Sequence, residues 1–166
     1  GADLAFESAT KYLNGHSDVL AGALTTNDPE SALWQQITAE RHGSGPVLGA
    51  FEAWLLIRGM RTVHLRVRQA SAGALQIAHG LKLHSKVEVV RYPGLPDDPG
   101  HAVSAKQMSG GFGGMLSFDV KGGAEAALAL VSRLKLVIPA TSLGGVESLI
   151  EHRATIEGDH LSLIHI

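Results

Sequence analysis

The chain has 166 residues, 45% of them hydrophobic and 18% charged, which is the composition of a folded globular protein and not of a disordered one. The formal net charge is −2 and there is no long basic run, so a nucleic-acid partner is not expected. The absence of cysteine excludes a disulfide framework and a thiolate metal site, and no apolar stretch is long and uninterrupted enough to predict a membrane span.

The first part of the sequence predicts two short buried strands followed by a helix. The strands are expected over residues 3–6 and 18–26, and the Asn14-Gly15 pair between them is a turn signal. Residues 28–45 predict an amphipathic helix, because an acidic residue and a proline stand near its start and glycines close it.

Two further helices are expected in tandem. Residues 47–59 are apolar on nearly all sides, which predicts a buried helix interrupted at Gly59. Residues 62–84 continue as a longer and more amphipathic helix. Trp34 and Trp54 fall at helical positions and are most simply interpreted as core residues.

The remaining sequence alternates between the two element types. Strands are expected over residues 87–92, 115–120 and 135–140, and helices over residues 102–108 and 124–134. The order is α/β at the start and α+β later. The glycine-rich run at 109–114 precedes a strand instead of following one, so it predicts closely packed backbone and not a dinucleotide site.

The last six residues, LSLIHI at 161–166, follow an abrupt polar segment and resemble the translated end of a transposon sequencing adapter. A short apolar terminal strand is the alternative. On the adapter interpretation these residues are excluded from the fold, as an artificial scar should be. The rest of the chain is then expected to be a piece of a longer protein, open at both ends.

The segment SATKYLNGHSD places Ser8, Thr10 and Lys11 close together before the turn signal. In an extended chain the two hydroxyls share one face and the amine points away, but a turn would let all three border a single ligand. A phosphate-bearing aldehyde suits this set, because hydroxyls hold the phosphate and the amine bonds to the aldehyde. Taken alone, this short pattern is weak, and a solvated lysine beside a turn is the better interpretation of it.

Two other patterns are weaker candidates. His16, Ser17 and Asp18 are the residue types of a hydrolase triad, but consecutive side chains diverge and cannot form a relay. His79 and His84 stand five apart, off the spacing of helical metal ligands, so no metal site is predicted.

The segment 8–24, SATKYLNGHSDVLAGAL, resembles the lysine segment of the pyridoxal-phosphate enzymes of cysteine and methionine metabolism. This is the family of cystathionine γ-synthase, the cystathionine lyases and methionine γ-lyase. Four further segments resemble the same family in the same order: LIRGMRTVHLRVR, VEVVRYPGLPDDPGH, QMSGGFGGMLSFDV and SLGGVESLIEH. The resemblance covers about residues 1–160.

The resemblance implies a fold and a division into domains. The chain is expected to be an α/β piece of a fold-type I pyridoxal-phosphate-dependent transferase. Residues 1–62 would be the end of the large cofactor domain, and residues 63–160 the smaller α+β C-terminal domain. The two would be joined through the long helix broken near Gly59.

The resemblance also implies roles for individual residues. Lys11 would be the catalytic lysine that carries pyridoxal 5'-phosphate, and Ser8 and Thr10 would hold the phosphate. Ser142 would help to hold the α-carboxylate of the substrate. Thr141, also assigned to substrate binding, stands where several cystathionine enzymes carry glutamate, so the choice between lyase and synthase specificity stays open.

The implied function is β- or γ-elimination from sulfur amino acids by a cystathionine lyase-type carbon–sulfur lyase. A γ-synthase-type replacement is the alternative, and so is a non-catalytic module, because further family site residues are expected outside this chain. The isolated chain is therefore expected to be inactive. The resemblance implies a small amino-acid substrate and a cytoplasmic homotetramer built as a dimer of dimers.

Overall fold

The structure is a computed structural model that describes residues 2–158. It divides into two compact units, Gly1–Val63 and His64–Ile166. The assignment of these units to a cofactor domain and a smaller domain stays a prediction. Residues 161–166, interpreted above as an adapter scar, lie outside the described residues. Among those described, none of the helices combines the length and the apolar character needed to cross a bilayer.

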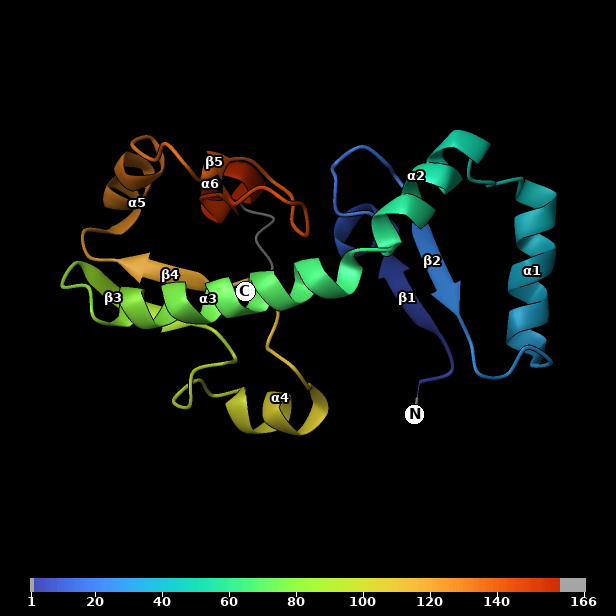
Figure 1. Cartoon of the computed structure of the whole chain (residues 1–166), viewed down its shortest axis with the longest axis horizontal. Coiled ribbons are helices and arrows are strands. Elements are labelled where there is room, and N and C mark those ends of the chain that lie inside the picture. Colours follow the sequence, from blue (N-terminus) through green and yellow to red (C-terminus); the bar gives the residue numbers. More distant parts are fainter. Residues whose placement is uncertain (1, 159–166) are drawn as a thin grey trace. The chain divides into compact units, whose positions relative to one another are not determined.

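The first unit contains one antiparallel strand pair (Figure 1). β1 (Ala5–Ser8) pairs with β2 (Gly22–Thr25), and the short π-helical turn η1 (Ala9–Leu13) follows β1 directly. The prediction of two strands is confirmed, but the prediction that they are buried is wrong, because most of their side chains are exposed. A two-stranded ribbon has no second layer of its own, so its apolar side chains stay exposed unless another element packs on them.

The helix α1 (Ala32–Ser44) begins later than predicted. Ser31 caps it, since its hydroxyl accepts a hydrogen bond from the N–H of Trp34 at 3.3 Å. Gly45 ends it in the left-handed conformation, with φ 71°, and donates its N–H to the Arg41 carbonyl at 3.0 Å. None of the residues of α1 is buried, so the helix does not present the buried face expected of an amphipathic one.

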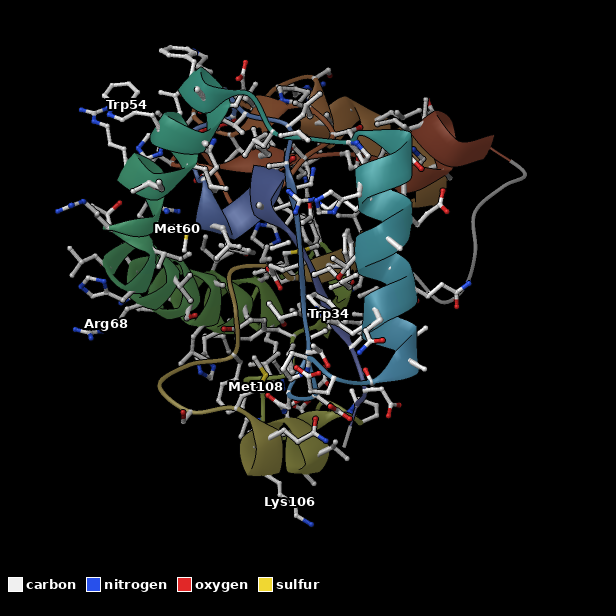
Figure 2. The ribbon with its side chains drawn as sticks, turned by 90° about the vertical axis from the view of Figure 1, so that its right-hand side faces the viewer. Trp34, Trp54, Met60, Arg68, Lys106 and Met108 are labelled. Atoms are coloured by element: carbon white, nitrogen blue, oxygen red, sulfur yellow. The ribbon has the colours of Figure 1, made fainter. Side chains whose placement is uncertain are left out.

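The helix α2 (Ala50–Met60) is not buried, contrary to the prediction. Large apolar side chains spaced three residues apart along this helix are exposed: Phe51, Trp54, Ile57 and Met60. Trp54 is 56% exposed, and Figure 2 shows it projecting away from the ribbon, so its assignment to a core is wrong. An all-round apolar pattern predicts burial only where other elements surround the helix.

The break after α2 lies two residues beyond the predicted position. Gly59 is inside the helix and is its one buried residue. Bonds of the 3₁₀ type, from the N–H of Arg61 to Arg58 and from the N–H of Thr62 to Gly59, tighten the last turn. The long predicted helix follows as α3 (Val63–Lys82).

The described part of the second unit, up to residue 158, contains two separate strand pairs. β3 (Val87–Arg91) and β4 (Ser117–Val120) pair antiparallel, while β5 (Ile138–Pro139) and β6 (Leu149–Ile150) pair parallel. The helices after α3 are α4 (His101–Gln107), α5 (Gly123–Val131) and α6 (Arg153–Glu157). All of these were expected except β6 and α6, which are too short to leave a periodic signal.

The core of the second unit forms where α3 meets the segment after β3. It consists of Ala74, Ala78, Tyr92 and Leu95. The buried Tyr92 hydroxyl lies 3.2 Å from the carbonyl of Ser71 and 2.9 Å from that of Gly113, so its proton is shared between them. A Cβ at Gly111 would lie 2.6 Å from the Cβ of Ser71. The prediction that the glycine-rich run serves close packing holds at Gly111 but not at Gly110 or Gly113, because a Cβ at either of these would meet nothing within 4 Å.

Candidate functional site

Lys11 lies within η1, the turn that leaves the end of β1. Its backbone angles, φ −84° and ψ −121°, interrupt the helical geometry, and its side chain is half-buried. The turn is closed by two backbone hydrogen bonds, from Asn14 N–H to the Ala9 carbonyl at 3.0 Å and from Gly15 N–H to the Lys11 carbonyl at 2.7 Å. Single π-type turns recur at functional sites.

The hydroxyl of Thr10 ties this turn to the segment that enters β2. It accepts a hydrogen bond from the N–H of Ala21 at 2.9 Å and donates a longer one, at 3.3 Å, to the carbonyl of the same residue. Since 3.3 Å is long for a hydrogen bond donated by a hydroxyl, the proton of Thr10 can be given to a better acceptor. Accepting from Ala21 also fixes the orientation of the hydroxyl.

Ser8 is the last residue of β1, opposite Gly22, and it is half-buried. Its hydroxyl does not cap the turn that follows. The strand end and the turn therefore bring the two hydroxyls and the amine of Lys11 into one short stretch of structure. This donor set fits a phosphate-bearing aldehyde, because it offers two neutral donors for the phosphate and one amine for the carbonyl carbon.

The segment after Lys11 is a compact hydrogen-bonded turn and not a catalytic relay. The Nδ1 of His16 lies 2.8 Å from the carbonyl oxygen of Asn14, to which it donates, and Asn14 Nδ2 donates to Asp18 Oδ1 at 2.7 Å. Ser17 between them has φ 58°, in the left-handed region. His16 and Asp18 are thus both bonded to Asn14, an arrangement in keeping with the prediction that these residues do not form a catalytic triad.

Asn14 is the residue at this site whose importance sequence reasoning missed. Its pairing with a following glycine is a turn signal and was interpreted as nothing more. The structure buries its side chain to 1% exposure. A buried polar side chain beside a candidate catalytic lysine would have been the stronger signal, but burial depends on contacts distant in sequence.

Thr141 and Ser142 belong to the second unit, in the segment that follows β5. The hydroxyl of Thr141 donates to Glu151 Oε2 at 2.6 Å. Arg153 Nη1 donates to the other oxygen, Oε1, of the same carboxylate at 2.5 Å. The roles of Glu151 and Arg153 beside a predicted substrate-binding residue were also missed, because only the pairing of β5 with β6 brings them there.

Charged pairs elsewhere in the second unit shift individual pKa values. The hydrogen bond from Lys82 lowers the pKa of Asp97, and the hydrogen bond from Arg91 lowers the pKa of Asp119. Burial lowers the pKa of Arg66. Within residues 2–158, three or more His, Asp or Glu side chains do not gather anywhere in a group that could hold a metal ion.

Comparison with known proteins gives a consistent result. The model of the family "Cys/Met metabolism PLP-dependent enzyme" matches residues 1–163. Cystathionine gamma-synthase of Mycobacterium tuberculosis is 48% identical over 152 residues, covering 92% of this chain and 38% of the relative. L-methionine gamma-lyase of Fusobacterium nucleatum is 44% identical over 156 residues, covering 94% of this chain and 39% of the relative. The chain thus spans about two-fifths of the length of the curated relatives it matches.

Solved structures agree in fold. Cystathionine gamma-synthase from Xanthomonas oryzae, in complex with aminoacrylate and cysteine, matches with a TM-score of 0.90 and 44% identity, over 98% of this chain and 41% of that one. Cystathionine gamma-lyase from yeast gives the same TM-score, identity and coverage. The prediction of an α/β piece of the fold-type I architecture is confirmed. By its sequence and its fold, this chain belongs to the family of pyridoxal-phosphate-dependent enzymes of cysteine and methionine metabolism.

Proposed function

We propose that the complete protein containing this chain is a pyridoxal-phosphate-dependent carbon–sulfur lyase that acts on sulfur amino acids by β- or γ-elimination. The observation that carries the proposal is the half-buried Lys11 in the turn after β1, next to two hydroxyls, in a chain of this family. When bound, the cofactor supplies an electron sink for the negative charge that develops on the substrate.

The residues of the first unit have separate roles in this proposal. Lys11 would hold the cofactor through Nζ and would move a proton to and from the carbon atoms of the substrate. Ser8 and Thr10 donate their hydroxyl protons to the phosphate. The bond that Thr10 accepts from Ala21 would orient the hydroxyl, and the long 3.3 Å bond that it donates to the Ala21 carbonyl would be exchanged for one to the phosphate.

The family resemblance also supports a role for Ser142 and Thr141 in substrate binding. Ser142 donates to the α-carboxylate of the substrate, and Thr141 lies beside Ser142 in the chain. The proton of Thr141 is directed at Glu151, so toward a substrate this hydroxyl acts as a hydrogen-bond acceptor.

A γ-replacement of the cystathionine γ-synthase type is the second candidate. The 48% identity to the Mycobacterium tuberculosis synthase and the structural match to the Xanthomonas oryzae synthase favour it. Both reactions need the same lysine and the same electron sink. They differ in whether an incoming thiol captures the activated substrate or the substrate breaks down to an oxo acid and ammonia.

The test is a paired assay of the complete, cofactor-loaded protein. Cystathionine alone should yield oxo acid, ammonia and thiol if the protein is a lyase. A γ-activated amino acid supplied with cysteine should yield cystathionine faster than oxo acid if it is a synthase. Cofactor binding without either reaction would overturn both candidates in favour of a non-catalytic module.

The complete protein is further proposed to be a cytoplasmic homotetramer built as a dimer of dimers. The family resemblance supports both statements, and the exposed large apolar side chains of α2 suggest that further polypeptide covers this helix in the complete protein. Light scattering of the complete protein should give four times the subunit mass, and cell fractionation should recover it in the cytoplasm. A monomeric mass, or recovery in another compartment, would contradict the corresponding statement.

A further inference from the structure

The buried side chain of Asn14 is the centre of the turn that carries Lys11. Its backbone N–H donates to the Ala9 carbonyl at 3.0 Å, and its side-chain Nδ2 donates to Asp18 Oδ1 at 2.7 Å. Its carbonyl accepts from Nδ1 of His16 at 2.8 Å. One residue that is 1% exposed thus fixes both the π-type turn before it and the loop after it.

The helix α2 packs directly on this residue. A Cβ added to Gly59 would overlap the Asn14 carbonyl oxygen and lie 2.9 Å from the carbonyl carbon. Gly59 is the buried residue of α2, and a glycine is required there so that the helix can approach the turn. Asn14 is therefore fixed by the helix as well as by its own hydrogen bonds.

These contacts reach Lys11 through the backbone. The bond from Asn14 to Ala9 encloses Lys11 in the turn, and the adjacent bond from Gly15 holds the Lys11 carbonyl at 2.7 Å. A displacement of Asn14 would therefore displace both of these bonds. A catalytic group must be held to within roughly half an ångström of its productive position. Such a displacement would therefore slow the reaction in which Lys11 takes part.

We propose that Asn14 is a positioning residue for Lys11, and that its bond to Asp18 sets the place of the lysine amine relative to a phosphate-bearing aldehyde. This rests on the proposed function, in which Lys11 bonds to that aldehyde. The direction of the hydrogen bond matters, because the amide at position 14 donates and the carboxylate at position 18 accepts. An aspartate at position 14 would bring two carboxylates together, one of them buried, and they would repel each other.

The pair allows an exchange experiment in the complete protein. Asn14→Asp should weaken cofactor affinity, measured by absorbance titration, by about tenfold or more, because a charge-assisted bond is replaced by repulsion. The double variant Asn14→Asp/Asp18→Asn restores a donor opposite an acceptor and should return the affinity to within about threefold of the original. The kcat should fall with Asn14→Asp while KM changes little, since the amino acid does not touch Asn14 in this proposal.

A second variant keeps the test decisive if Asn14→Asp does not fold. Asp18 is exposed, so Asp18→Ala should fold while still removing the acceptor of Asn14. It should slow covalent attachment of the cofactor to Lys11, measured by borohydride trapping and peptide mapping, by about threefold to tenfold. Asp18→Asn, which keeps an acceptor oxygen, is the matched control and should attach cofactor at nearly the original rate.

The outcomes separate the two proposals. If the unaltered complete protein does not trap cofactor on Lys11, the proposed function fails. If it does, but folded Asp18→Ala traps cofactor at the same rate and affinity, the positioning role of Asn14 is wrong. A lowered melting temperature of the cofactor-free variants with unchanged trapping would likewise show that the pair serves stability alone.

Discussion

Thr141 and Glu151 are joined by a 2.6 Å hydrogen bond across the ends of two parallel strands. The backbone ladder there pairs Ile138 with Leu149 and Pro139 with Ile150, and the proline cannot donate an N–H. The hydrogen bond between the two side chains therefore adds a contact between β5 and β6, which few backbone hydrogen bonds join. Because Glu151 also accepts from Arg153 at the start of α6, one carboxylate joins β5, β6 and α6 beside the predicted substrate residue Ser142.

Replacing this carboxylate by an amide should weaken the junction. Glu151→Gln keeps one acceptor oxygen for two donors, so the hydrogen bond from Thr141 or the one from Arg153 to this side chain is weakened. We expect the free energy of unfolding to fall by about 1 kcal/mol, since the pair is partly exposed and hydrogen bonds to charged groups contribute modestly there. Urea unfolding measures the change. Thr141→Ser, which keeps the hydroxyl, should leave the midpoint near its original value, and an unchanged midpoint for Glu151→Gln would contradict the prediction.

The ion pair between Arg91 on β3 and Asp119 on β4 should add to stability except in acid. The bond of 2.6 Å lowers the pKa of Asp119 below its ordinary value of 3.8. Stability from a depressed carboxyl pKa is fully present above the unfolded value and is lost as the pH falls through the folded one. Loss is therefore expected below about pH 3.8. Asp119→Asn should flatten this part of a stability–pH curve, and salt should reduce the difference, because both side chains are partly exposed. An equally steep acid limb in the variant would contradict the assignment.

The sequence could predict the features that arise within one short segment, but not those that depend on contacts between segments far apart in the chain. The periodicity of residues 62–84 is carried within one segment and predicts α3 well. The candidate lysine and its hydroxyls are adjacent in the chain, so their order alone was informative. The apolar residues of α2 show that the helix can be buried, but not which element covers it, and Trp54 is exposed for that reason. The contact of Gly59 with Asn14, and the pairing that brings Glu151 to Thr141, arise only when distant segments meet.

Lys11→Ala in the complete protein should abolish both the visible absorbance of the bound cofactor and turnover. The prediction follows from the proposed function, because the aldehyde needs an amine and alanine offers none. Ser8→Ala and Thr10→Ala should be milder, since one charge-assisted hydrogen bond is worth roughly 1.5–3 kcal/mol, or about ten- to a hundredfold in affinity. Borohydride trapping with peptide mapping checks the site. Label confined to Lys82 or Lys106, or full activity in Lys11→Ala, would end the assignment.

Gly59→Ala should destabilise the first unit although alanine is the better helix former. Helix propensity alone would favour the change by about 1 kcal/mol. The new methyl group, however, meets the backbone of Asn14, which cannot rotate away as a side chain could. We expect a net loss of about 2 kcal/mol in the free energy of unfolding, as for other overpacked positions. Gly73→Ala is the matched control, since Gly73 is also helical and a Cβ there meets nothing within 4 Å. It should stabilise the protein by up to about 1 kcal/mol. Urea midpoints that shift in the same direction for both variants would show that the close approach of α2 to Asn14 does not determine the outcome.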